Sequence, residues 1–277
     1  MALIQVNFLS QTLMRTVPMQ VILPVDKMTF PGMPKREEKP YKTLYLLHGV
    51  FGNYTDWVSG TCIQRWAEEK NLAVVMPSAD NKFYVDQEKG EDHYGKFIGE
   101  ELVEITRKMF PLSQKREDTF IGGLSMGGYG ALRNGLKYHD TFGCIAALSS
   151  ALIIDDIDKR TDDVPFFLDS RNFAESIFGN LEAAVKGDKN PRYLVKKLKA
   201  EGTEFPKIYM ACGLEDSLLA ANRDFKRFLD EHGVDAVLEE SEGAHEWDFW
   251  NRSIKRVLDW LPLEMEEKGM NSGNVGI

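Results

Sequence analysis

One serine in the sequence has the neighbours expected of a nucleophile. Gly123-Leu124-Ser125-Met126-Gly127 fits the pattern G-x-S-x-G, in which the glycines allow a turn too tight for larger side chains. An apolar run at 119–123 precedes the motif and a helical pattern at 126–138 follows it. Because a strand that turns sharply into a helix exposes the serine hydroxyl, we interpret Ser125 as a nucleophile. The alternatives are an ordinary glycine-rich turn between strand and helix and a phosphate-binding loop. The lysine that P-loops place after the last glycine is absent.

A serine hydroxyl needs a base within hydrogen-bond reach, and the five histidines are the candidates. His139 and His232 each end a predicted helix, where a cation suits the helix dipole. His48 ends a predicted buried strand, and we expect it to brace the loop that follows. His245 lies after the last predicted strand and before the last predicted helix, which is the place of the base when the order is serine, acid, histidine. We predict that His245 is the general base.

The acid that orients this histidine is expected after the penultimate strand, predicted at 207–212. The turn that follows contains two neighbouring carboxylates, Glu215 and Asp216. Either one could instead cap the helix predicted to begin near Leu218. The residues themselves leave both carboxylates open as the acid.

Acyl transfer through a serine also needs two donors for the oxyanion of the tetrahedral intermediate. The first is the backbone N–H of the residue after the nucleophile, which is Met126. The second comes from the loop after the third strand, His48-Gly49-Val50-Phe51-Gly52, where we assign the N–H of Val50. Phe51 and Trp57 flank this loop, and we expect both to contact the substrate.

A scaffold must bring these residues together, and strands alternate with helices along most of the chain. Strands are predicted at 3–9, 19–23, 43–48, 72–77, 119–123, 144–148, 207–212 and 236–240. Helices are predicted at 61–70, 97–110, 126–138, 218–232 and 246–261. The first two strands are expected to form an antiparallel pair. The rest predicts an α/β fold with a mostly parallel central sheet flanked by helices.

Residues 151–205 interrupt this alternation with helix-like pieces at 173–178, 181–186 and 192–200. We interpret this segment as a helical insertion over the active site, because it is too long for a simple connection. Residues 1–263 are predicted to form one domain that includes this insertion. Residues 30–41 are expected to form a surface loop, and the polar, glycine-rich residues 264–277 a flexible tail.

Composition narrows the possible partners. With a formal net charge of −9 over 277 residues, the chain is not expected to bind nucleic acid through phosphate contacts. It has no apolar run of the ~20 residues needed to span a membrane. Three cysteines without a signal-peptide pattern favour reduced thiols and a cytoplasmic location. No metal or cofactor is expected, because zinc motifs are absent and the acidic run at 155–163, interpreted as a solvated loop, lacks the spacing of a calcium loop.

Five segments, LLHGVFGNYTDW, VVMPSADNKFYVD, FIGGLSMGGYGAL, ACGLEDS and GAHEWDFW, resemble the tributyrin-esterase branch of the esterase D group of α/β-hydrolases. Feruloyl esterases, S-formylglutathione hydrolases and the antigen 85 mycolyltransferases also belong to that group. The resemblance implies Ser125, Asp216 and His245 as the triad, Val50 and Met126 as oxyanion donors, and short acyl esters as substrates. The loop of S-formylglutathione hydrolases contains a cysteine where this chain has Phe51-Gly52-Asn53, which argues against glutathione thioesters.

The leading hypothesis is therefore a serine carboxylesterase that hydrolyses short-chain acyl esters through an acyl-enzyme on Ser125. Aryl-acyl esters of the feruloyl type and acetylated-sugar esters are further candidate substrates. Two alternatives remain, an acyltransferase that passes the acyl group to an alcohol and a non-catalytic binding module on the same fold. The expected partner is a small-molecule ester. Apolar residues in the insertion also leave a homo-oligomer open.

Overall fold

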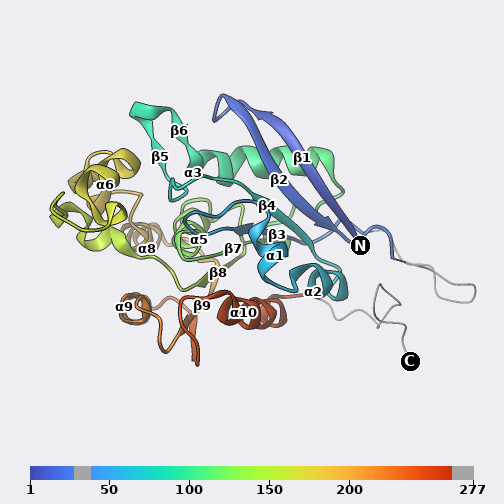
Figure 1. Cartoon of the computed structure of the whole chain (residues 1–277). Coiled ribbons are helices and arrows are strands. Elements are labelled where there is room, and N and C mark those ends of the chain that lie inside the picture. The colour runs from blue at the N-terminus through green and yellow to red at the C-terminus, as the bar shows by residue number, and fades with distance from the viewer. Residues whose placement is uncertain (28–38, 264–277) are drawn as a thin grey trace, which may run out of the picture.

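The computed structural model describes residues 1–27 and 39–263. Eight strands of this part form one sheet in the order β1-β2-β4-β3-β7-β8-β9-β10 (Figure 1). The strands are β1 (Ala2–Ser10), β2 (Arg15–Leu23), β3 (Thr43–Leu47), β4 (Ala73–Pro77), β7 (Thr119–Leu124), β8 (Cys144–Leu148), β9 (Lys207–Gly213) and β10 (Ala236–Ser241). Strand β2 pairs antiparallel with both β1 and β4, and all other pairs are parallel. The predicted antiparallel start and mostly parallel sheet are confirmed.

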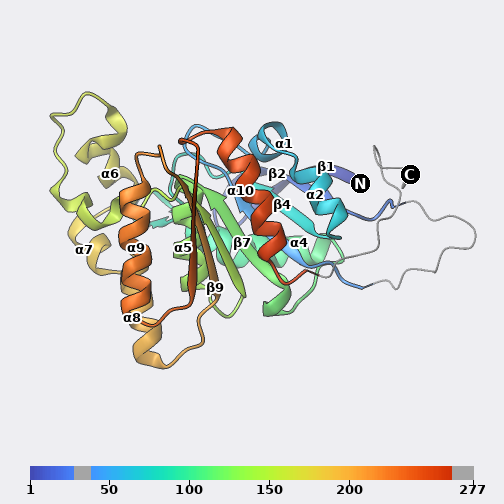
Figure 2. The ribbon, with the colours of Figure 1, turned by 90° about the horizontal axis from the view of Figure 1, so that it is seen from below.

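Helices cover both faces of the sheet, as the alternation predicts. One face carries α1 (Asp56–Gly60), α2 (Ile63–Glu69) and α10 (Trp247–Trp260); the other carries α4 (Leu102–Met109), α5 (Met126–Lys137), α8 (Pro191–Glu201) and α9 (Leu219–Glu231) (Figures 1 and 2). Strand β3 shows the reason. Its residues Tyr45 and Leu47 pack into the core on one face, and Leu44 and Leu46 into the core on the other. A strand buried on both faces must be apolar throughout.

The insertion lies at the end of the molecule opposite the N-terminus in both views (Figures 1 and 2). It contains the short 3₁₀ helices η4 (Ile153–Lys159) and η5 (Phe167–Asp169), followed by α6 (Arg171–Phe178), α7 (Leu181–Lys186) and α8. The helices at the three predicted positions are therefore present. The solvated loop expected at 155–163 is wrong in its first part. There, Ile157 is buried, and the carboxylate of Asp155 accepts a hydrogen bond from Nε of Arg192 at 2.7 Å.

Other differences concern short elements. The helix predicted at 97–110 begins as α3 (Tyr94–Lys96) and a π-helical turn, η2 (Phe97–Glu101), before α4. The structure also has a small hairpin of β5 (Asp86–Gln87) and β6 (Asp92–His93), and the 3₁₀ turns η1 (Glu88–Gly90) and η3 (Arg116–Asp118). Elements this short contain too few residues to show a period in the sequence. The tail at 264–277 and most of the loop predicted at 30–41 lie outside the described residues.

The parallel strands position the candidate site. Ser125 follows β7, Asp216 follows β9, and His245 follows β10. Because β7, β8, β9 and β10 all run in the same direction, the turns after them meet at one edge of the sheet. Within the described part of the chain, no helix is long and apolar enough to cross a membrane.

Candidate active site

The backbone of Ser125 has an unusual conformation, with φ 54° and ψ −117°. Both flanking glycines are needed for this turn. A Cβ on Gly123 would lie 2.4 Å from the carbonyl oxygen of Gly127, and a Cβ on Gly127 would lie 2.5 Å from that of Leu47. Such a conformation costs on the order of 1–3 kcal/mol and persists only where the surroundings hold it. Strand β8 helps to hold it, because the Ser125 N–H donates to the Leu148 carbonyl at 2.9 Å.

The structure brings the predicted serine, histidine and aspartate together in one chain of hydrogen bonds. Nε2 of His245 lies 3.0 Å from the hydroxyl of Ser125, and Nδ1 of His245 lies 2.9 Å from Oδ2 of Asp216. The Asp216 side chain is fully buried, whereas the His245 side chain is 35% exposed. Because Nδ1 faces a carboxylate, it carries the proton of the neutral imidazole, which leaves Nε2 free to accept the serine proton.

The environment of Asp216 favours a charged carboxylate despite its burial. The Leu218 N–H donates to its Oδ1 at 2.9 Å, so Asp216 also contacts the first turn before α9. Burial acts to raise the pKa of the Asp216 carboxyl, but hydrogen bonds from His245, the Leu218 amide and the Ser149 hydroxyl outweigh burial and hold this pKa below its usual value.

Glu215, the other candidate acid, does not contact the histidine ring. Its Oε2 accepts a hydrogen bond from the Gly243 N–H at 2.7 Å, and its own N–H donates to the Gly243 carbonyl at 3.1 Å. The two segments pack so closely that a Cβ on Gly213 would lie 2.0 Å from the Gly243 oxygen. Glu215 therefore fastens the loop that carries His245, while Asp216 faces the imidazole.

The two predicted oxyanion donors lie on segments that pack against each other. Met126 is the first residue of α5, where a backbone N–H has no acceptor within the helix. In the described part of the chain, the Val50 N–H donates to no protein acceptor. A Cβ on Gly49, the residue before Val50, would lie 3.5 Å from the Cβ of Ser125. The loop after β3 thus lies directly beside the serine.

His48 braces this loop, as predicted. The Ala79 N–H donates to Nε2 of His48 at 3.0 Å, so the other ring nitrogen carries the proton and donates to the Gly49 carbonyl at 2.7 Å. Burial lowers the pKa of His48 and favours this neutral form. The Tyr84 hydroxyl donates to the His48 carbonyl at 2.9 Å. With both ring nitrogens in use, His48 is unsuited to act as a base.

Phe51 and Trp57, the two expected substrate contacts, have different surroundings. Phe51 is 64% exposed, and its ring centroid lies 6.5 Å from that of Phe167 in the insertion. Trp57 is only 1% exposed, donates from its indole to the Leu47 carbonyl at 3.0 Å and packs edge-on against Trp247. The expectation that Trp57 contacts substrate therefore needs correction. Its indole N–H is paired with the end of β3, so it supports the loop from within the core.

Two residues near the site were not singled out from the sequence as site residues. The Trp250 ring lies edge-on to the His245 ring, with centroids 4.9 Å apart, and its indole N–H donates to the Ser149 hydroxyl at 3.1 Å. Ser149 follows β8 at the same sheet edge as the triad, which is the one signal that could have pointed to it. Trp250 is noticeable in the sequence only as part of the apolar face of the last helix.

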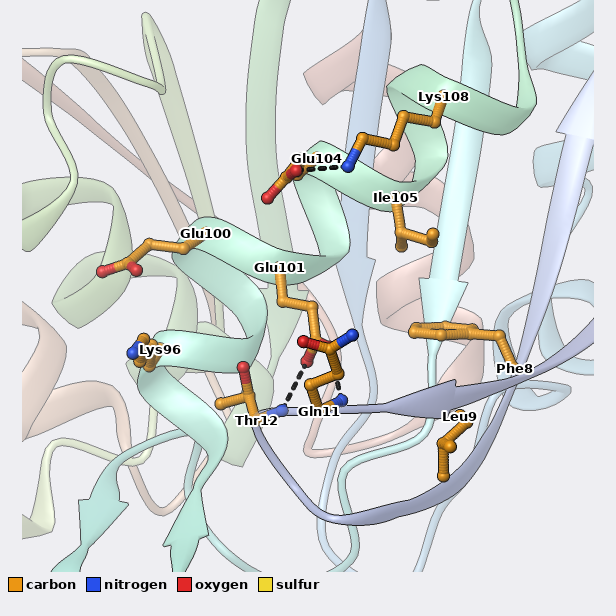
Figure 3. Close-up of a pocket in the computed structure, with 10 residues that line it drawn as sticks. All are labelled: Phe8, Leu9, Gln11, Thr12, Lys96, Glu100, Glu101, Glu104, Ile105 and Lys108. Carbon is orange, nitrogen blue, oxygen red and sulfur yellow. Dashed lines mark hydrogen bonds and ion pairs between the residues drawn. The ribbon is translucent and has the colours of Figure 1, made fainter.

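A separate cavity of about 260 Å³ lies between the β1–β2 turn and the segment from α3 to α4, and none of the residues above lines it (Figure 3). Glu101, one of its lining residues, points toward the β1–β2 turn. Its carboxylate accepts hydrogen bonds from the Ser10 hydroxyl and from the Gln11 and Thr12 amides at 2.5, 2.6 and 3.2 Å. These bonds fasten the β1–β2 hairpin to the helical segment that carries Glu101.

The α/β-hydrolase class is defined by a serine on a strand-to-helix turn of a mostly parallel sheet, with an aspartate and a histidine on turns that follow later strands. This structure has that arrangement. Within that class, the chain belongs to the Esterase family, because the model described as "Putative esterase" matches residues 10–261.

Individual relatives agree with this assignment. An acetyl esterase of Caldicellulosiruptor saccharolyticus is 49% identical over 261 residues, which cover 94% of this chain and 98% of that protein. A fluorophosphonate-binding serine hydrolase F of Staphylococcus aureus has a TM-score of 0.81 at 34% identity, and an S-formylglutathione hydrolase of the same organism has 0.80 at 34%. Both structural matches cover 94% of this chain and 98% of the other. The protein is a carboxylic ester hydrolase.

Proposed function

We propose that the protein hydrolyses short-chain carboxylic esters through an acyl-enzyme on Ser125. The observation that carries the proposal is the continuous hydrogen-bond chain from the Ser125 hydroxyl through His245 to Asp216, at 3.0 and 2.9 Å. A serine hydroxyl becomes nucleophilic when a neighbouring base can take its proton.

In the first half of the reaction, Oγ of Ser125 attacks the ester carbonyl as Nε2 of His245 takes the hydroxyl proton. The ionised Asp216 stabilises the resulting imidazolium and keeps the ring oriented. The N–H groups of Val50 and Met126 donate to the oxyanion of the tetrahedral intermediate. As the carbonyl re-forms, the C–O bond to the alcohol breaks, and His245 returns its proton to the departing oxygen.

In the second half, water attacks the acyl-serine. His245 takes a proton from this water, and a second oxyanion occupies the same pair of backbone donors. When the intermediate collapses, the acid leaves and the proton on His245 returns to Oγ of Ser125. An alcohol in place of water would complete an acyl transfer with the same residues. The ratio of hydrolysis to transfer therefore depends on which acceptor reaches the acyl-enzyme.

The surroundings of the serine support a small acyl group. The insertion presents Phe166 and Phe167, which are 47% and 54% exposed, beside the exposed ring of Phe51. The nearby residues 155–163 are rich in aspartate. A long acyl chain gains about 0.8 kcal/mol for each methylene it buries, and three aromatic rings offer little surface for more than a few of them. We propose a preference for acyl chains of about C2 to C6, with some tolerance for aryl-acyl groups. The acetyl esterase relative at 49% identity supports the short end of this range.

A panel of p-nitrophenyl esters from acetate to laurate tests the acyl preference directly. We expect kcat/KM to peak at or below C6 and to fall steeply by C12, whereas a maximum at C12 or longer would contradict the proposal. Feruloyl esters, acetylated sugars and S-formylglutathione belong in the same panel. The thioester is included because a structural neighbour at 34% identity is an S-formylglutathione hydrolase.

Two further measurements address the mechanism. A fluorophosphonate probe should label the wild-type protein and should not label Ser125→Ala, which should also lose ester turnover while keeping its circular dichroism spectrum. A Ser125→Ala variant with full activity would exclude the acyl-enzyme. Product analysis in the presence of an added alcohol separates hydrolysis from transfer.

A further inference from the structure

The turn that follows β8, residues 149–151 and here called the β8 turn, touches the segments that carry the nucleophile and the acid. Besides the bond from Ser125 to Leu148, the Ala151 N–H donates to the Ser125 carbonyl at 3.0 Å. Between them, Ser149 donates its N–H to the Ala211 carbonyl of β9 at 2.7 Å and has φ 46°. This left-handed conformation is uncommon for serine. The β8 turn is thus held between the strand that leads to Ser125 and the strand that leads to Asp216.

Ser149 is fully buried, and its hydroxyl is bonded to the last helix. The Trp250 indole N–H can only donate, so in the 3.1 Å bond between them the Ser149 oxygen is the acceptor. The hydroxyl proton is then available to a second partner. The Ser149 hydroxyl acts to lower the pKa of both the Asp216 carboxyl and the Cys212 thiol, so these two groups are its remaining neighbours. The same Trp250 ring packs edge-on against His245. One tryptophan therefore contacts the histidine directly and is bonded to the serine that lowers the pKa of the aspartate.

We propose that Ser149 and Trp250 are positioning residues for the reaction: Trp250 orients the Ser149 hydroxyl, and Ser149 fixes the carboxylate of Asp216 toward His245. The inference rests on the proposed roles of Ser125, His245 and Asp216. It adds a relay that runs from the last helix, α10, through the β8 turn to the acid.

The relay has a chemical consequence. His245 and the Leu218 amide donate to Asp216, and the Ser149 hydroxyl lowers the pKa of the same carboxyl. Each of the three therefore disperses part of the negative charge. Removing the Ser149 donor leaves more charge facing His245, which stabilises the imidazolium. The free enzyme then needs a higher pH to become active. Losing one hydrogen bond to a charged group also leaves the carboxylate less well oriented, which slows the chemical step.

Other ionisable groups surround this pair. Burial and the charge of Asp216 raise the pKa of the Cys212 thiol on β9 to about 12, while the Ser149 hydroxyl acts to lower it. The Glu215 carboxylate is bound to the Gly243 amide, and the Glu246 carboxylate accepts from the Ala244 amide at 3.3 Å. Substitution of Ser149 or Trp250 removes none of these groups, so each variant is compared with the wild type with the same ionisable groups in place.

The test compares Ser149→Ala, Trp250→Phe and the double variant. Phenylalanine keeps an aromatic ring against His245 but lacks the indole N–H. We expect Ser149→Ala to lower kcat on p-nitrophenyl acetate about 10-fold with little change in KM, and to move the midpoint of the kcat/KM profile to higher pH. Trp250→Phe should also lower kcat and move the midpoint of the kcat/KM profile to higher pH, but by smaller amounts than Ser149→Ala. In the Ser149→Ala background, Trp250→Phe should add nothing, because its donor acts through Ser149.

Matched controls lie on the same helix. Ser253 is buried three positions after Trp250, and within the described residues its hydroxyl has no hydrogen-bond partner. Ser253→Ala should therefore leave kcat and the pH midpoint unchanged. Trp260→Phe is the corresponding control for loss of an indole. If Ser149→Ala folds poorly, Ser149→Gly removes the hydroxyl and suits the left-handed backbone.

The relay is wrong if Ser149→Ala and Ser149→Gly match Ser253→Ala in kcat and pH midpoint, or if the effects of Ser149→Ala and Trp250→Phe simply add. Neither result affects the proposed function, which depends on Ser125→Ala. Loss of turnover in Ser125→Ala together with an unchanged Ser149→Ala would overturn the relay alone.

Discussion

The neighbouring carboxylates of Glu215 and Asp216 hold the histidine loop at two different points. Glu215 accepts the Gly243 N–H at 2.7 Å, and Asp216 faces Nδ1 of His245 at 2.9 Å. Two adjacent residues thus have distinct tasks, one on the backbone of the loop and one on the imidazole. This division leads to the first prediction.

Asp216→Asn should lower kcat by a factor on the order of 10³–10⁴, as in other triads, because the amide can no longer stabilise the imidazolium or select the productive tautomer. Glu215→Gln should cost little, since a glutamine oxygen can still accept the Gly243 N–H. Steady-state kinetics of the two isosteric variants on one butyrate ester decide the point. The reverse ranking would move the acid by one residue.

The kcat/KM of the wild type should rise with pH through one ionisation, as His245 loses a proton and becomes able to accept that of Ser125. His245→Ala should abolish this activity and retain the fold. His48→Ala should instead lower the melting temperature, because His48 bonds both Ala79 and Gly49 inside the core. A flat profile from acid to alkaline pH would speak against a histidine base.

Phe51→Ala and Trp57→Ala should distinguish a residue that contacts the substrate from one that stabilises the fold. Phe51 is exposed beside Phe167, so its loss should raise KM for aryl-acyl esters and leave the free energy of unfolding nearly unchanged. Trp57 is buried, so its loss should destabilise the fold by about 3–5 kcal/mol. Urea denaturation together with kinetics on feruloyl and acetyl esters measures both effects. Equal stability losses in the two variants would contradict this assignment.

Acid should weaken the fold through Asp86, which lies 3.3 Å from the fully buried guanidinium of Arg133. Burial of Asp86 acts to raise its pKa, but Arg133, the Lys96 amide and Lys137 hold that pKa below the ordinary value of 3.8. A carboxyl whose pKa is lower in the folded state than in the unfolded state stabilises the folded protein at every pH above its unfolded pKa. This contribution to the stability of the fold is lost as the pH falls below 3.8 and passes through the lower pKa of Asp86 in the folded protein.

Asp86→Asn should therefore destabilise the protein at pH 7 by about 2–3 kcal/mol. The loss is smaller than for a buried charge without any partner, because Asp188 also lies 3.5 Å from Arg133. The difference in the free energy of unfolding between wild type and variant should become smaller on acidification. Urea unfolding at pH 7 and below pH 4 measures this difference. Asp156→Asn, which breaks an exposed pair with Lys159, is the control and should leave stability unchanged. A gap that stays constant with pH would show that Asp86 is not the group that titrates.

The sequence predicts most of the sheet because buried parallel strands such as Thr43–Leu47 are continuous apolar runs. It also places Ser125, Asp216 and His245 at one edge, because each follows a strand of that sheet. It could not place Trp57, since an aromatic residue after a loop has the same pattern whether it faces substrate or core. Nor could it predict the contact of Trp250 with Ser149, because 101 residues separate them in the chain and neither segment encodes the other's position.

The hydrogen bond between Ser125 and His245 joins residues that are 120 positions apart in the chain. Bringing them together requires β7, β8, β9 and β10 to pair in order, and non-local strand pairing is slow to form. Collapsed folding intermediates, even those rich in native-like helix, will therefore have no esterase activity. During refolding from denaturant, the recovery of ester turnover should lag behind the return of the helical circular dichroism signal, and the enzyme's own reaction reports the completion of its sheet.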